Sequence, residues 1–89
     1  MNVLIFEYYN FGIEDVKETL TKNGHKYKAI ESALIKERKS TEFDSIFEKA
    51  YEEGINGRPY DCVFTFNYSP VISVNCNKVN LPYIAWVYD

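Results

Sequence analysis

The fold is decided by residues 3–7 (VLIFE), a continuous apolar run that ends on an acid. An uninterrupted run of this kind is typical of a parallel strand covered on both faces. Two further runs, residues 61–66 (DCVFTF) and residues 82–89 (PYIAWVYD), share the pattern. We therefore expect three buried strands of one parallel sheet, with Trp86 in the core rather than serving as a platform for a ligand.

Two segments between these strands have the spacing of amphipathic helices. In the first, Ile13, Val16 and Leu20 recur three and four residues apart among charged residues, which predicts a helix with one apolar face. The second contains apolar residues in the same period: Phe43, Ile46, Phe47, Ala50 and Tyr51. Thr41 and Asp44, three residues apart, are the expected capping pair at its start.

The remaining segments predict a short helix, an edge strand and one undecided stretch. Ser69 and Pro70 offer a cap and a first-turn proline for the short helix. Its inner stripe comprises Ile72, Cys76 and Val79. Residues 25–30 (HKYKAI) alternate polar and apolar, and their lysines suit a sheet edge where further pairing must be discouraged. Residues 31–39 fit either a short helix or a charged loop.

The order of these elements predicts an α/β protein, because strands that alternate with helices form a parallel sheet with right-handed crossovers. With the lysine-bearing strand at one edge, we expect a four-stranded sheet in the order 2-1-3-4. Residues 1–89 would form a single, partial Rossmann-like three-layer sandwich. The fourth strand, residues 82–89, has no lysine or glutamate to discourage pairing. We expect it to join a second copy of the chain, in a homo-oligomer, or the missing C-terminal domain of a longer enzyme.

Composition excludes several classes of protein. The net charge is -3 and the basic residues are scattered except at residues 36–39 (KERK), so no nucleic-acid partner is expected. No apolar run is long enough to span a membrane and no signal peptide is visible, which favours the cytoplasm. Cys62 and Cys76 lack the spacing of metal ligands, so we expect two small core residues and no metal.

Candidate site residues gather where the order of the strands reverses. In an open parallel sheet, ligands bind beyond the carboxyl ends of the strands at this reversal, here between the first and third strands. The segments that reach it contain Glu7, Tyr8, Asn10, Gly12, Asn67, Tyr68, Ser69, Tyr88 and Asp89. Tyrosine, asparagine and acidic side chains can hold a polyol by stacking and hydrogen bonding. The sequence therefore predicts a substrate-binding crevice at this edge.

Each candidate also has a structural interpretation. The tyrosines can cap the core with their hydroxyls in water, and Asn10 and Gly12 can be turn residues. Ser69 fits a helix cap better than a ligand, although a free helix start is also a weak anion site. Glu7 and Asp89 are candidates for a general base or for binding hydroxyls, but a lone acid at a strand end is usually only solvated. No catalytic residue can be assigned from these patterns.

Several familiar ligands of this architecture are excluded by the residues that follow the strands. Residues 8–12 (YYNFG) have neither the G-x-G-x-x-G of a dinucleotide site nor the Gly-Lys-Ser/Thr of a P-loop. They also lack the hydroxyl-rich phosphate loop of a flavodoxin. A phospho-receiver domain needs an aspartate where the third strand is followed by Asn67. We therefore expect no cofactor in this chain.

Two stretches resemble a known family. Residues 61–70 (DCVFTFNYSP) and residues 80–89 (NLPYIAWVYD) are similar to the N-terminal region of bacterial glycosyltransferases related to the spore maturation protein CgeB, a domain of unknown function. The resemblance extends over nearly the whole chain, and its specific part is the Phe-Asn-Tyr and Trp-Val-Tyr-Asp runs.

The resemblance implies a GT-B architecture, in which two Rossmann-like halves face each other across a cleft. The C-terminal half of such enzymes usually holds the nucleotide-sugar, and the N-terminal half lines the acceptor side. It implies that residues 8–12, residues 67–69 and residues 88–89 lie on the acceptor side. We expect an acceptor-side domain that is inactive alone, because transfer needs donor and acceptor held together. The alternatives are a stand-alone binding or oligomerisation module and a small independent enzyme.

Overall fold

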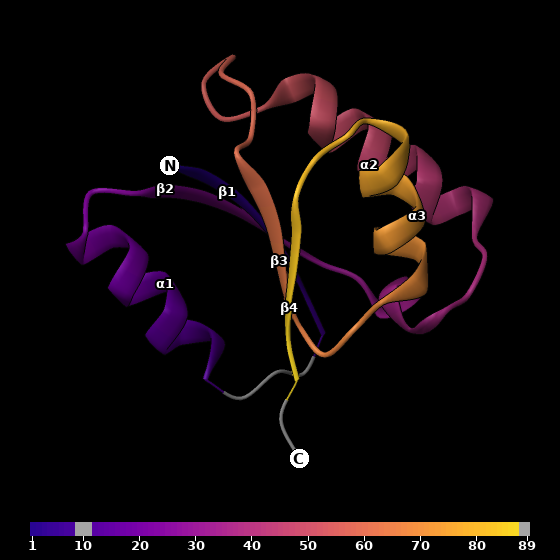
Figure 1. Ribbon diagram of the computed structural model, residues 1–89, viewed down its shortest axis with the longest axis horizontal. Coiled ribbons are helices and arrows are strands. Elements are labelled where there is room, and N and C mark those ends of the chain that lie inside the picture. The colour runs from indigo at the N-terminus through magenta and orange to yellow at the C-terminus, as the bar shows by residue number, and fades with distance from the viewer. Residues whose placement is uncertain (9–11, 88–89) are drawn as a thin grey trace.

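A computed structural model describes residues 1–8 and 12–87, and residues 9–11 and 88–89 lie outside the description. Its elements are β1 (Asn2–Glu7), α1 (Ile13–Lys22), β2 (Lys26–Glu31), the 3-10 helix η1 (Ala33–Lys36), α2 (Thr41–Glu53), β3 (Cys62–Phe66), α3 (Pro70–Lys78) and β4 (Tyr83–Trp86). The strands form one parallel sheet in the order β2-β1-β3-β4 (Figure 1). The predicted fold class, strand order and strand direction are confirmed.

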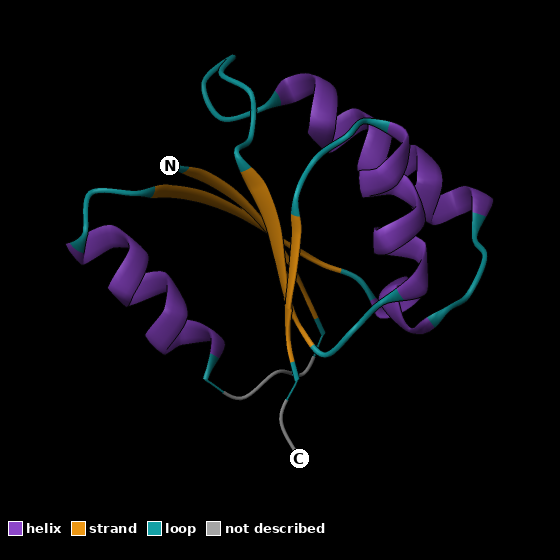
Figure 2. Cartoon of the chain, in the orientation of Figure 1, coloured by secondary structure: helices purple, strands orange, loops and turns teal. Residues whose placement is uncertain are grey.

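Helices cover the two faces of the sheet unequally (Figure 2). The connection from β1 to β2 crosses the sheet in one direction, and the connections that lead to β3 and β4 cross it in the other. Because parallel crossovers are right-handed, this reversal places α1 on one face and α2 with α3 on the other. The α1 face therefore has less helical cover than the α2 face.

The core has one cluster on each face of the central strand β1. On the α2 face, the ring of Phe6 packs against Phe43 and Phe47, with ring centroids 5.1 and 5.9 Å apart. On the α1 face, Ile5 packs in a cluster with Ile13. Both strand residues are fully buried, as expected of a central parallel strand.

Both cysteines are buried core residues, as the sequence predicts. Cys62 belongs to the cluster on the α1 face and Cys76 to the cluster on the α2 face. Burial raises the pKa of both thiols, that of Cys76 to about 12. A thiol that stays protonated at neutral pH is a poor nucleophile and a poor metal ligand.

The helix caps confirm one prediction and correct another. Ser69 caps α3, with Pro70 in the first turn. The cap of α2 is Ser40 and not Thr41, because Ser40 has an extended backbone and its hydroxyl accepts a hydrogen bond from the backbone N–H of Phe43 at 3.0 Å. Asp44 does not take part in a capping pair and accepts a hydrogen bond from the Asn75 amide at 2.8 Å instead.

Residues 31–39, which the sequence left undecided, contain both alternatives. A single 3-10 turn, η1, begins after Ser32, whose hydroxyl accepts a hydrogen bond from the N–H of Leu34. Ile35 in this turn is buried against the α2 face, and a charged loop leads from η1 to α2.

β4 departs from the sequence expectation. Its residues were expected to be covered on both faces, but only Tyr83 and Ala85 are partly buried. Ile84 is 50% exposed and Trp86 is 62% exposed, so the prediction that Trp86 belongs to the core is wrong. The physical reason is the unequal cover described above, since the apolar cluster under α1 includes residues of β1, β2 and β3 but none of β4.

Candidate functional site

The carboxyl ends of β1, β3 and β4 lie together beside the start of α1 (Figure 1). We call this end of the sheet, where the strands finish, the sheet edge, as distinct from the outer sides of β2 and β4. The backbone N–H of Asn67, just after β3, donates to the carbonyl oxygen of Trp86 at 2.8 Å. Gly12 begins α1 with a left-handed backbone, at φ 82°. A side-chain carbon added there would lie 3.8 Å from the ring of Phe66. The structure therefore brings Gly12 and Asn67 to the edge at which the sequence predicts a site.

Three of the candidates, Asn10, Tyr88 and Asp89, lie outside the described residues.

Glu7 ends β1 on the α1 face and forms an ion pair with Lys17 of α1. The Lys17 ammonium lies 3.1 Å from Glu7 Oε2 and 3.3 Å from Oε1, and the two side chains are only 14% and 17% exposed. Lys17 also lies 3.2 Å from Glu14. Burial alone would lower the pKa of Lys17, but the hydrogen bonds with Glu7 and Glu14 outweigh it and the pKa is raised. This pair fixes a charged, partly buried carboxylate at the sheet edge.

Tyr8 faces the opposite side of the sheet from Glu7, as alternation along a strand requires. Its ring packs against the core cluster of the α2 face, and the Lys36 ammonium lies 4.9 Å from its centroid. A cation at this distance over an aromatic ring is an attractive contact. Tyr8 and Glu7 thus approach the edge from different faces.

A chain of hydrogen bonds holds the turn after β3 in place. The Thr65 hydroxyl donates to the carbonyl oxygen of Asn67 at 2.8 Å, and it lies 2.6 Å from the Tyr83 hydroxyl. Because the Thr65 proton is already used, Tyr83 must donate to Thr65. The Tyr83 oxygen in turn accepts from the backbone N–H of Ser69 at 3.0 Å. Each of the three donors in this series of hydrogen bonds therefore has one acceptor.

The hydrogen-bond chain holds the turn in which Asn67 lies exposed to solvent. This residue is exposed and has a left-handed backbone, at φ 66°, a conformation that asparagine tolerates better than most residues. Tyr68 follows it with 60% of its surface exposed, and its ring centroid lies 6.1 Å from that of Tyr83. The buried hydrogen bonds therefore hold two exposed groups at the sheet edge, the amide of Asn67 and the phenol of Tyr68. Burial raises the pKa of Tyr83 despite the hydrogen bonds with Thr65 and Ser69, which lower it.

Ser69 has a structural role. It is 2% exposed, its hydroxyl donates to the carbonyl oxygen of Ile35 at 2.6 Å, and the same oxygen caps α3 by accepting from Ile72 N–H. Both polar groups of Ser69 are thus committed within the chain, and it ties α3 to η1 rather than facing a ligand.

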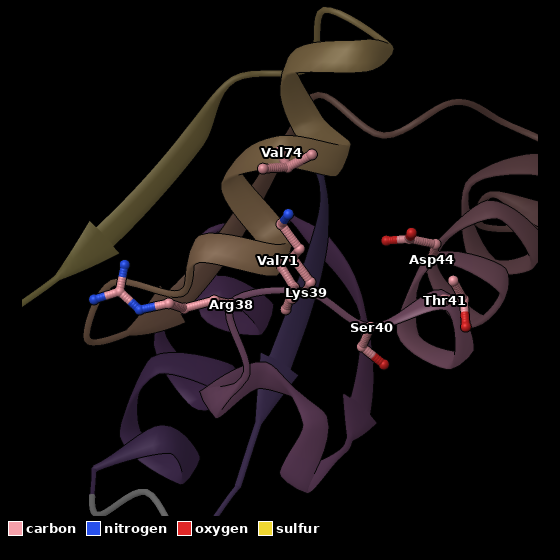
Figure 3. A pocket seen from close by; sticks show the side chains of 7 residues that line it. All are labelled: Arg38, Lys39, Ser40, Thr41, Asp44, Val71 and Val74. Carbon is pink, nitrogen blue, oxygen red and sulfur yellow. The ribbon is translucent and has the colours of Figure 1, made fainter.

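A cavity that the sequence analysis did not identify lies between the loop before α2 and the first half of α3. It has a volume of about 450 Å³ and is lined by Arg38, Lys39, Ser40, Thr41, Asp44, Val71 and Val74. Figure 3 shows the Arg38 side chain extending away from Asp44. The available signal was the basic run at residues 36–39. None of the candidates predicted from sequence lines this cavity.

Lys17, Thr65 and Tyr83 are the residues at the sheet edge that sequence reasoning missed. Lys17 has the spacing of a solvent-facing helix residue, and Thr65 and Tyr83 lie inside apolar strands. Among the described residues, His, Cys, Asp and Glu side chains form no group of three that could hold a metal ion. No helix within residues 1–8 and 12–87 is long and apolar enough to cross a membrane.

No protein-family model matches this chain, and searches of curated proteins and of solved structures found no match.

Proposed function

We propose that this chain is the N-terminal, acceptor-side domain of a glycosyltransferase with the GT-B architecture, and that it is inactive alone. The observation that supports this function best is the meeting of Glu7, Gly12 and Asn67 at the reversal point of the parallel sheet. Ligands of open α/β sheets bind at this point. The family resemblance of residues 61–70 and residues 80–89 supports the same function.

The chemistry of the sheet edge suits a sugar with free hydroxyls. The Glu7 carboxylate accepts hydrogen bonds, and the exposed Asn67 amide can both donate and accept them. The exposed ring of Tyr68 offers an apolar surface beside a hydroxyl. Vicinal hydroxyls on one face of a sugar and C–H groups on the other match this combination. The acceptor is therefore a sugar or glycan.

The domain is proposed to lack turnover because transfer requires donor and acceptor to be held together. The donor would be bound by a second, C-terminal domain joined through β4. No cofactor is assigned to this chain, and the proposed location is the cytoplasm.

Saturation-transfer NMR with the methyl glycosides of glucose, galactose and N-acetylglucosamine tests this function. We expect weak binding, on the order of millimolar, because one half of a cleft provides few contacts. Tyr68→Ala should abolish the signal, whereas Tyr51→Ala, at an exposed tyrosine of α2 whose ring stacks on Phe47, should retain it. Absence of binding by all three glycosides, or equal loss in both variants, would contradict the proposal.

A second candidate function is a stand-alone oligomerisation module. The observation that favours it is the exposed apolar edge of β4, where Ile84, Trp86 and Val87 are at least half exposed. An exposed apolar strand edge tends to pair with another chain. Light scattering coupled to size-exclusion chromatography tests this function, which requires a mass above the monomer's 10.4 kDa.

A further inference from the structure

The free edge of β4 has a defined set of backbone groups. The carbonyl oxygens of Pro82 and Trp86 accept hydrogen bonds from residues of the β3 segment, Val63 and Asn67. Successive residues of a strand direct their N–H and C=O groups to opposite sides. Tyr83, Ala85 and Val87 therefore direct theirs away from β3, toward the open edge.

The side chains beside this edge are apolar and uncharged. Ile84 and Trp86 are in register with Phe64 and Phe66 of β3, which pack in the cluster on the α1 face, so all four lie on that face. Ile84 and Trp86 are 50% and 62% exposed. Residues 80–87 contain no charged residue. Nothing in this segment repels a second, identical segment.

The other edge of the sheet is different. β2 carries Lys26, Lys28 and Glu31, and Lys28 forms an ion pair with Glu53 of α2 at 3.1 Å. Charged residues of this kind discourage pairing of a strand edge. The chain thus protects one edge of its sheet and leaves the other neutral, which favours pairing through β4 alone.

We propose that β4 pairs antiparallel with β4 of a second copy of this chain, about a two-fold axis at Ala85. In this register Ala85 lies opposite Ala85 of the second copy, and Tyr83 lies opposite its Val87. All the outward backbone groups of these residues then have partners, because each such pair exchanges both of its hydrogen bonds. A register centred on Ile84 would leave the outward backbone groups of Val87 without a partner.

The same register also joins the exposed apolar side chains. Ile84 lies opposite Trp86 of the second copy, on the same face, and the symmetry repeats this contact. Pairs of an aromatic and a β-branched residue across antiparallel strands are favourable. A single short strand makes a small interface, so the dimer is weak and exchanges with monomer. This inference rests on the second proposed function and gives its partner and geometry.

The test mixes two variants that each carry one added cysteine, Ile84→Cys and Trp86→Cys, one of them isotope-labelled, under mild oxidation. These positions face each other in a non-hydrogen-bonded pair with Cα atoms about 4.5 Å apart, within reach of a disulfide. Two copies of residue 84 are displaced along the strands, with Cα atoms about 7–8 Å apart, which disfavours a disulfide. Mass spectrometry should find the mixed disulfide in at least about tenfold excess over either homodimer. The native Cys62 and Cys76 are buried and do not compete.

Lys28→Cys, on the protected edge, is the matched control and should form no specific disulfide. Sizing of the unsubstituted protein at about 100 µM and about 1 µM should show a shift from dimer toward monomer, as mass action requires. A dimer with equal amounts of mixed and self disulfides would overturn the register but leave the oligomerisation module standing. A monomer at both concentrations would overturn both. The sugar binding of the glycosyltransferase proposal is tested separately, by saturation-transfer NMR, and its outcome does not depend on these results.

Discussion

Replacing Tyr83 with phenylalanine removes one oxygen atom from the hydrogen-bond chain behind the sheet edge. That oxygen accepts from Ser69 N–H at 3.0 Å and lies 2.6 Å from the Thr65 hydroxyl, to which it donates. Thr65 is fully buried and Ser69 is 2% exposed, so water cannot easily replace the lost partner. A buried polar group left without a partner costs about 1–3 kcal/mol. Because Thr65 keeps its bond to Asn67, we expect a loss of about 2 kcal/mol.

Urea unfolding followed by circular dichroism measures this loss. With a urea dependence of about 1–2 kcal/mol/M for a chain of this size, the midpoint should fall by about 1–2 M. Tyr51→Phe is the control, because Tyr51 is 36% exposed and its ring stacks on Phe47 without depending on the hydroxyl. That variant should change the free energy of unfolding by less than about 0.5 kcal/mol.

A double-mutant cycle with Thr65→Val separates the hydrogen bond from other effects of the substitution. Residues in one hydrogen-bond chain have coupling energies of about 0.5–3 kcal/mol. We expect the double variant to be more stable than the sum of the single losses predicts. If Tyr83→Phe costs no more than Tyr51→Phe, or the two losses simply add, the proposed chain of bonds is wrong.

Three further substitutions probe other parts of the account, each by urea unfolding. The Cys76 thiol has a pKa of about 12 in the fold against an ordinary 9.0, so the unfolded chain ionises first and stability is lost as the pH rises above 9.0. Between pH 8 and pH 10, the free energy of unfolding of Cys76→Ala should therefore fall by about 1 kcal/mol less than that of the unsubstituted protein. Equal losses in the two proteins would contradict this. Lys17→Met leaves the partly buried Glu7 carboxylate unpaired and should lower the free energy of unfolding by about 1–2 kcal/mol. The additional change Glu7→Gln should restore part of this loss. A double variant no more stable than Lys17→Met would show that the ion pair is not the cause. Ser69→Ala removes both the cap of α3 and the bond to Ile35 and should cost about 2 kcal/mol, whereas a loss below about 0.5 kcal/mol would show that water replaces both.

The strands and their order could be predicted because the sequence pattern reflects local burial. Residues 3–7 form an apolar run since β1 is covered on both faces, and the lysines at positions 26 and 28 mark an edge. The exposure of β4 could not be predicted in the same way. Tyr83, Ile84, Ala85 and Trp86 are all apolar, so no alternation reveals which face lacks a helix.

Strand order alone gives the position of the sheet edge at which a site is predicted, but not the contacts behind it. The reversal point follows from strand order, so Gly12 and Asn67 could be placed at the same edge. The contacts that shape it join residues far apart in sequence, such as Thr65 with Tyr83, and no local spacing signals them. Lys17 illustrates the same difficulty, because a helix pattern does not distinguish a solvated lysine from one paired with a strand-end acid.

A two-dimensional 1H–15N NMR titration of the isotope-labelled protein with the tightest-binding methyl glycoside tests the central claim most directly. The account predicts that the largest chemical-shift changes occur at the backbone amides of Glu7, Gly12, Asn67 and Tyr68. Changes concentrated at residues 38–41 beside the cavity of Figure 3 would place the binding site elsewhere and contradict the claim. A uniform lack of change would contradict it as well.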